Sequence, residues 1–79
     1  MQINFKLVSE IEDIETIAEG KGIRDRRQLE KLYGKGSWKK KKGLAAIEIE
    51  TGEVLWAELH WYECHGRGRV RMRIKRFLL

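Results

Sequence analysis

The chain of 79 residues contains no proline, one cysteine and two histidines. The single cysteine, Cys64, cannot form a disulfide within the chain, and it cannot supply a zinc site built from several cysteines. No apolar run approaches the length of about 20 residues that a membrane-spanning helix needs, and the first residues show no signal-peptide pattern. We therefore expect a single domain (1–79) in the cytoplasm, with no cofactor, no metal and no membrane partner.

Positive charge exceeds negative charge by +5, and it is unevenly distributed. Residues 1–20 carry a net charge of −4, residues 21–43 of +8, residues 44–66 of −5 and residues 67–79 of +6. Neighbouring blocks of opposite sign neutralise each other in a fold, so unpaired positive charge is expected mainly in residues 21–43. Such an excess predicts a polyanionic partner.

The hydrophobic pattern predicts an α+β fold. Residues 23–33 have helical spacing, and Gly34 follows them as a residue able to take the positive φ of a helix end. From Gly36 onward the period changes to two, which is typical of strands. We expect one helix (about 23–33) packed on a three- to four-stranded antiparallel β-meander, with strands at about 37–50, 53–63 and 69–77 and a further candidate at 13–19.

Residues 9–19 fit two descriptions. Ser9 and Glu12 match a capping box, and the following isoleucines have roughly helical spacing. The segment IETIAEG also reads as a short strand that ends at Gly20. We favour the strand at 13–19.

A three-residue turn at 50–52 sets the strand register. It pairs Ile47 with Leu55 and Ala45 with Ala57, so that these residues share one face of the sheet. The last strand is expected to continue this face, and the helix is expected to cover it. The pairs expected there are Trp61 with Val70, Leu59 with Met72, and Ala57 with Ile74.

The opposite face then gathers polar groups: the same register places Glu58 opposite Arg73, His60 opposite Arg71, and Tyr62 opposite Arg69. A carboxylate, an imidazole and guanidiniums are the parts of a phosphodiester-cleaving site, with Glu58 as base, His60 as acid and Arg71 and Arg73 on the phosphate. The alternative is a lattice of cross-strand ion pairs that only stabilises the sheet.

A second basic group surrounds the predicted helix. Its lysines and arginines, interleaved with aromatic residues, are typical of a surface that binds a polyanion. The alternative is a solubilising rim whose lysine run discourages edge-to-edge strand pairing. The residues predicted to bind nucleic acid on either surface are Arg24, Arg27, Lys31, Trp38, Lys39, Lys40, Lys41, Arg69, Arg71 and Arg73.

The segment AELHWYECHGRGRVRMRIKRFLL, with GSWKKKKGLAAIEI before it, resembles a group of small uncharacterised bacterial proteins. The resemblance includes a lysine-rich strand start, the AELHWYE hairpin, a glycine-containing loop and a closing IKRFL, and it implies no activity. More loosely, a basic helix on a short antiparallel sheet with a His/Glu/Arg face is similar to RelE-like and barnase-like ribonuclease toxins.

Three functional hypotheses follow. The first is a nucleic-acid binding module, with RNA favoured. The second is a toxin-type ribonuclease that uses Glu58, His60, Arg71 and Arg73. The third is a protein-interaction module, such as an antitoxin or an accessory subunit. We favour the first.

Overall fold

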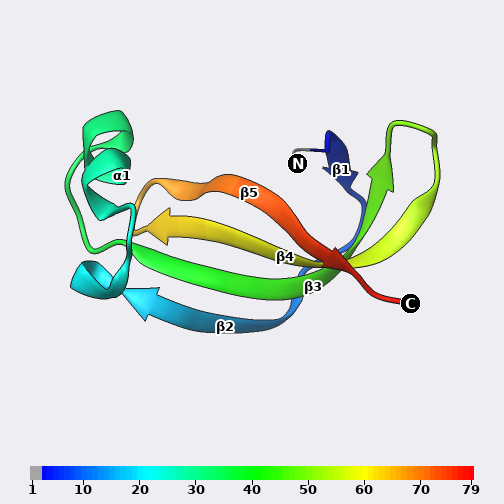
Figure 1. The fold of residues 1–79 in the computed structure, drawn as a ribbon, viewed down its shortest axis with the longest axis horizontal. Coiled ribbons are helices and arrows are strands. Elements are labelled where there is room, and N and C mark those ends of the chain that lie inside the picture. Colours follow the sequence, from blue (N-terminus) through cyan, green and yellow to red (C-terminus); the bar gives the residue numbers. More distant parts are fainter. Residues whose placement is uncertain (1–2) are drawn as a thin grey trace.

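The computed structural model describes residues 3–79, which form an elongated body of 37 × 22 × 22 Å. A curled antiparallel sheet of five strands makes up most of the chain, and one α-helix lies at one end of it (Figure 1). The mixed α+β class is confirmed, with strand as its main component. The elements in chain order are β1 (Phe5–Leu7), β2 (Glu12–Glu19), the 3-10 turn η1 (Gly20–Gly22), α1 (Arg26–Tyr33), β3 (Lys39–Ile49), β4 (Val54–Cys64) and β5 (Gly68–Phe77).

The sheet order is β1-β3-β4-β5, and β2 also pairs with β3. β1 and β2 therefore follow one another along the same edge of β3, with a break near Ser9. The strand predicted at 13–19 is present as β2, and the helical alternative for residues 9–19 is wrong. β1 was not predicted, because a strand of three residues is too short to show the two-residue period in the sequence. No helix in residues 3–79 has the length and apolar character needed to cross a bilayer.

The hairpin between β3 and β4 has the predicted register. Ala45 lies opposite Ala57 and Ile47 opposite Leu55. The N–H of Ile49 donates to the carbonyl oxygen of Glu53 at 3.0 Å, which closes the three-residue turn. Its last residue, Gly52, has a φ of 90°, a conformation that favours glycine.

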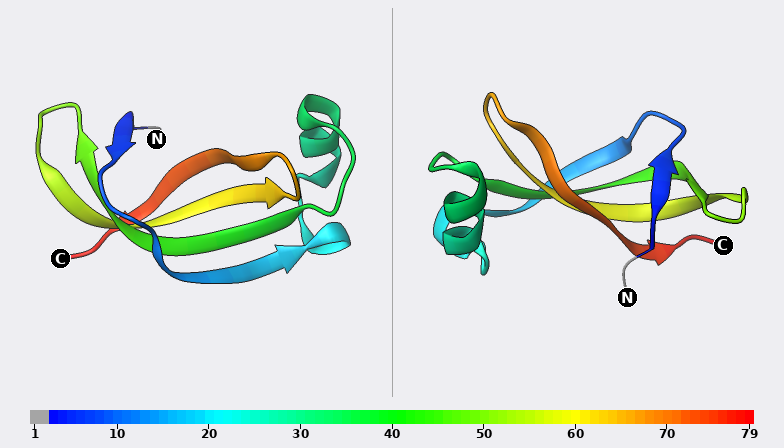
Figure 2. Two further views of the ribbon diagram at one scale, coloured as in Figure 1. Left: turned by 180° about the vertical axis from the view of Figure 1, so that it is seen from behind. Right: turned by 90° about the horizontal axis from the view of Figure 1, so that it is seen from above.

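One face of the sheet carries a fully buried apolar cluster. Its members were all predicted for this face, whereas Leu55, which was also predicted there, is only partly buried. The partly buried residues packed against it are Phe5 of β1, Ile11, Ile49 of β3, and Met72 and Ile74 of β5. The sheet itself is strongly curled (Figure 2). The expectation that the helix covers this face is wrong, because among residues 3–79 no residue of α1 belongs to this cluster or packs against it. The cluster is Ala45, Ile47, Ala57, Leu59 and Trp61.

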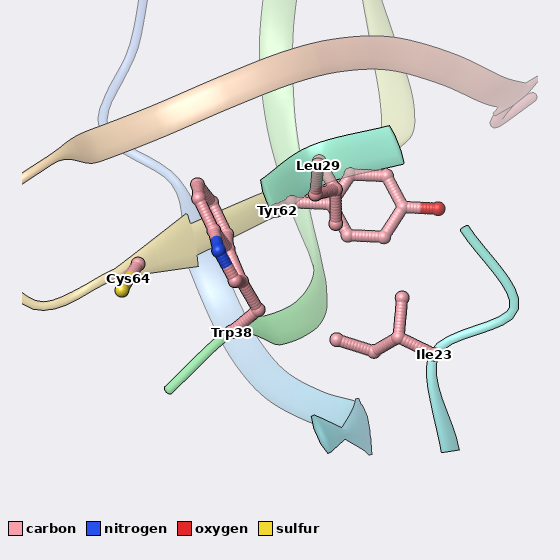
Figure 3. Close-up of a cluster of buried hydrophobic side chains, with 5 residues drawn as sticks. All are labelled: Ile23, Leu29, Trp38, Tyr62 and Cys64. Carbon is pink, nitrogen blue, oxygen red and sulfur yellow. The ribbon is translucent and has the colours of Figure 1, made fainter. Parts of the chain in front are cut away.

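The helix packs instead against a second cluster at the end of the sheet, on the other face (Figure 3). Leu29 of α1 is fully buried there, and the indole N–H of Trp38 donates to the carbonyl oxygen of Gly34 at 2.9 Å. α1 is shorter than predicted, since it begins at Arg26. Gly34 has the expected positive φ, at 100°. The cluster consists of Ile23, Leu29, Trp38, Tyr62 and Cys64.

The predicted register between β4 and β5 is wrong. Two irregularities shift the pairing, one between Glu58 and Leu59 and one between His60 and Tyr62. A bulge places two residues of one strand opposite one residue of its partner, and it bends the strand. The observed pairs are Glu58 with Arg76, Leu59 with Ile74, His60 with Arg73, and Tyr62 with Val70.

Candidate anion-binding site

A hollow of about 480 Å³ lies where the face of β4 that carries His60 meets the segment between η1 and α1. Its charged lining is almost entirely basic, with Asp25 as the one carboxylate. Ile17, Ala18 and Ile23 supply an apolar wall. We call this feature the basic hollow. Its basic residues are Arg24, Lys40, Arg71, Arg73 and Lys75, beside His60.

Three separate parts of the chain place these side chains. Lys40 lies in β3 directly opposite Tyr62 of β4, so its side chain emerges on the same sheet face as His60. Its ammonium lies 5.8 Å from the centre of the Tyr62 ring, within cation–π distance. Arg24 lies in the turn before α1, and Tyr62 is itself buried beneath this turn and α1. The prediction that Tyr62 belongs to an exposed polar face is therefore wrong.

The bulge in β5 brings two arginines to the hollow. Arg73 lies opposite His60, where Arg71 was predicted. Arg71 occupies the inserted position and has a φ of 54°, which non-glycine residues rarely adopt. Its Nη1 atom is shielded from solvent and has no hydrogen-bond acceptor among residues 3–79. A shielded guanidinium N–H without an acceptor is destabilising, so an anionic oxygen bound here would offset that cost.

The lysine run differs from the hollow in its charge partners. Lys41 lies 3.2 Å from Glu63, Lys42 lies 3.5 Å from Glu15, and Lys39 lies 4.0 Å from Glu19. β2 and β4 therefore neutralise three of the four lysines, and only Lys40 points into the hollow. Among residues 3–79, none of the five basic side chains of the hollow makes an ion pair with a carboxylate.

Glu58 is held by two groups beside the hollow. Nε2 of His60 lies 2.7 Å from Oε2, while Nε and Nη2 of Arg76 lie 3.1 and 3.0 Å from Oε1. The hydrogen bond from His60, together with the positive charges of Arg76, His60 and Lys42, holds the pKa of Glu58 below its ordinary value, against the opposing effect of burial. The predicted partner of Glu58 was Arg73, and the shifted register replaces it with Arg76.

This geometry bears on the predicted catalytic roles. A carboxylate with a lowered pKa and two engaged oxygens is a weak proton acceptor at neutral pH, so Glu58 is poorly suited to act as a general base. Because an ionised carboxylate only accepts hydrogen bonds, Nε2 of His60 carries a hydrogen, and Nδ1 is the atom that can accept a proton whenever the ring is neutral. His60 is therefore the better placed of the two for proton transfer.

The other predicted binding residues lie outside the hollow. Trp38 is buried, with 1% of its surface exposed, and is not available to stack on a base. Arg69 lies over the ring of Trp61 at 5.5 Å, on the opposite face of the sheet from His60. Arg27 and Lys31 are exposed on α1 but do not line the hollow. Arg76 was not predicted, because only the bulge reveals its position.

No group of three His, Cys, Asp or Glu side chains in residues 3–79 is arranged to hold a metal ion. Comparisons with protein-family models, with curated proteins and with solved structures each found no match, so what this site does rests on its geometry and chemistry.

Proposed function

We propose that the protein is an RNA-binding module that holds phosphate groups in the basic hollow. One observation carries the proposal: five basic side chains from β3, β5 and the turn before α1 surround one hollow without carboxylate partners among residues 3–79. Arginine presents a planar fork of donors that matches phosphate oxygens, and three of the five residues are arginines.

Counterion release gives this proposal a measurable signature. Each phosphate that a lysine or arginine neutralises releases condensed cations, so affinity falls as salt rises. A residue that already pairs with a carboxylate contributes less, because binding must compete with the existing ion pair. Within the lysine run 39–42, the structure therefore separates Lys40, which lines the hollow, from the three lysines that pair with carboxylates.

The test is an RNA titration followed by amide chemical shifts at about 50 and about 200 mM salt, a range over which several phosphate contacts lower affinity by orders of magnitude. Arg73→Gln and Lys42→Gln each remove one positive charge, from the hollow and from the pair with Glu15 respectively. We expect Arg73→Gln to weaken binding about tenfold and to reduce the salt slope, while Lys42→Gln changes affinity about twofold or less.

Equal losses in the two variants would show that the response follows net charge and not the hollow. An absence of salt-sensitive shifts at Lys40, Arg71 and Arg73 would overturn the proposal. The same oligonucleotide prepared as DNA tests the preference for RNA, since tighter binding of DNA would contradict it. Binding of neither nucleic acid would direct attention to the third hypothesis, a partner protein.

A specific observation also favours a second candidate, a toxin-type ribonuclease. Glu58 fixes the orientation of His60 at the edge of a hollow that contains two arginines. In this version His60 takes the proton of the 2′-hydroxyl as this oxygen attacks the phosphorus, and then returns the proton to the leaving 5′-oxygen. The arginines stabilise charge on the phosphate, and Glu58 orients the imidazole. The role predicted for Glu58 thus passes to His60.

A further inference from the structure

Trp56 differs from the other two tryptophans in its surroundings. Its exposed fraction is 46%, whereas those of Trp38 and Trp61 are 1% and 0%. The ring of Trp38 lies 6.0 Å from that of Tyr33, and Trp61 lies beneath Arg69. In the described part of the chain, the Trp56 ring has neither an aromatic nor a cationic neighbour. It is a free apolar surface on a strand of the sheet.

Trp56 lies on the same face of the sheet as the basic hollow. It is four positions before His60 in β4, so the two side chains emerge on one side, about 13 Å apart along the strand. Glu58 lies between them, and its charge is neutralised by Arg76, whose side chain is 68% exposed. A path from the hollow to Trp56 is therefore flanked on the β5 side by Arg73 and Arg76.

The β2 side of this face offers no comparable attraction. Asp13 and Glu15 of β2 line a separate hollow together with Lys42 and Glu58, and Lys42 already pairs with Glu15. On the β5 side, Arg73 makes no ion pair among residues 3–79, so a polyanion is attracted more strongly to that side. The charges thus favour the path that ends at Trp56.

Resting on the proposed function, we infer that the RNA bound here is single-stranded and that one of its bases stacks on the indole of Trp56. The bases of a duplex stack on one another, so a duplex presents mainly phosphates and sugars to a sheet face. An unpaired base can place its ring against an aromatic side chain, and this contact tolerates any sequence. The arginines and Trp56 therefore make separable contributions.

Binding measurements on Trp56→Ala and Trp56→Phe test the inference, with a single-stranded RNA oligonucleotide and the duplex of the same sequence as ligands. We expect Trp56→Ala to weaken single-strand binding about tenfold and Trp56→Phe about threefold or less, because phenylalanine retains an aromatic ring. Duplex affinity is expected to change about twofold or less in both variants. Trp56→Phe also guards against a folding defect, since it conserves most of the side chain.

Tryptophan fluorescence provides a second readout. Because Trp38 and Trp61 are buried, quenching by single-stranded RNA should come from Trp56 and disappear in Trp56→Phe. Unchanged single-strand affinity in Trp56→Ala would overturn the stacking inference while leaving the binding role of the hollow intact. The absence of any salt-sensitive RNA binding by the wild-type protein would remove both.

Discussion

Arg76 contacts Glu58 across the β4–β5 pair with two guanidinium nitrogens on a single carboxylate oxygen, at 3.0 and 3.1 Å. His60 occupies the other oxygen. The Glu58 side chain is 12% exposed, and its charge is therefore balanced locally and not by solvent alone. This three-residue arrangement marks the boundary between the basic hollow and the path toward Trp56.

The first prediction concerns this contact. Arg76→Gln should raise the pKa of Glu58, because it removes a positive charge that favours the ionised carboxylate. The pKa can be followed from the side-chain carboxyl shift of Glu58 during an NMR pH titration. Arg73→Gln is the matched control, since it removes the same charge from the residue opposite His60. A larger shift in Arg73→Gln would support the unbulged register and contradict the one described.

The second prediction is a loss of stability in acid. The hydrogen bond from Trp61 and the contact with Lys41 hold the pKa of Glu63 below its ordinary value, as His60 and Arg76 do for Glu58. A group with a lowered folded-state pKa contributes stability above its ordinary pKa, near 4.5, and loses it as the pH falls through the folded value. The free energy of unfolding should therefore fall as the pH drops below about 4.5.

Urea unfolding between neutral pH and acid measures this dependence. Glu58→Gln and Glu63→Gln should each reduce stability at neutral pH and flatten its decline in acid, because glutamine does not titrate. Glu10→Gln is a control, since Glu10 is exposed and makes no ion pair among residues 3–79. An acid decline as steep in Glu58→Gln as in the wild type would show that Glu58 does not contribute to it.

The sequence predicts the β3–β4 hairpin well because a turn glycine and a two-residue period specify the same register there. Gly52 fixes the turn, and a shift by one residue would expose Ile47 and bury polar neighbours. The pattern of β5 is equally regular, yet its register was predicted wrongly. The sequence alternates between basic and apolar residues without interruption through the bulge. Periodicity alone therefore cannot reveal Arg71 as the inserted residue.

The location of the helix could not be predicted for a different reason. The residues of α1 specify an amphipathic helix but not which of two apolar surfaces it covers. The sequence presents the buried Trp38 and Tyr62 as exposed groups, because four lysines follow Trp38 and Tyr62 shares a strand face with His60. Their burial depends on the path of residues 20–25, which turns the chain across the end of the sheet. The basic hollow depends on the same path, and only its arginines, Lys40 and His60 were evident from the sequence.

The third prediction concerns Trp38 as a core residue. Trp38→Ala should destabilise the protein by about 3–5 kcal/mol, because it leaves a large cavity beneath α1. Trp38→Phe should cost about 1–3 kcal/mol, from the lost volume and the lost hydrogen bond to Gly34. Thermal or urea unfolding measures both losses. Trp56→Phe is the control at an exposed site and should change stability by about 0.5 kcal/mol or less. A similar loss at both positions would contradict the burial of Trp38.

The fourth prediction uses two glycines with different surroundings. A side chain at Gly43 would meet the backbone oxygen of Glu12 and the indole of Trp61, each 3.1 Å from the new Cβ, and would also contact Ile11. Gly43→Ala should therefore destabilise the protein by about 1–3 kcal/mol. Gly22→Ala places its Cβ in open space without a positive φ, so it should be neutral or stabilise by up to about 1 kcal/mol. Equal stability of the two variants would show that β2 does not pack closely on β3 at Gly43.

The last prediction separates binding from cleavage. Glu58 is ionised, and its two oxygens accept hydrogen bonds from His60 and Arg76, so only His60 of the Glu58–His60 pair is suited to proton transfer. Ribonuclease chemistry of this kind needs both an acid and a base. We therefore expect the wild-type protein to bind RNA without cleaving it above background, and His60→Ala to show the same background rate. The measurement is cleavage of a labelled RNA by protein purified in parallel with His60→Ala. A rate that is present in the wild type, absent in His60→Ala and partly retained in Glu58→Gln would instead establish His60 as a catalytic residue, because Glu58→Gln retains an oxygen that can still accept the imidazole hydrogen and orient the ring.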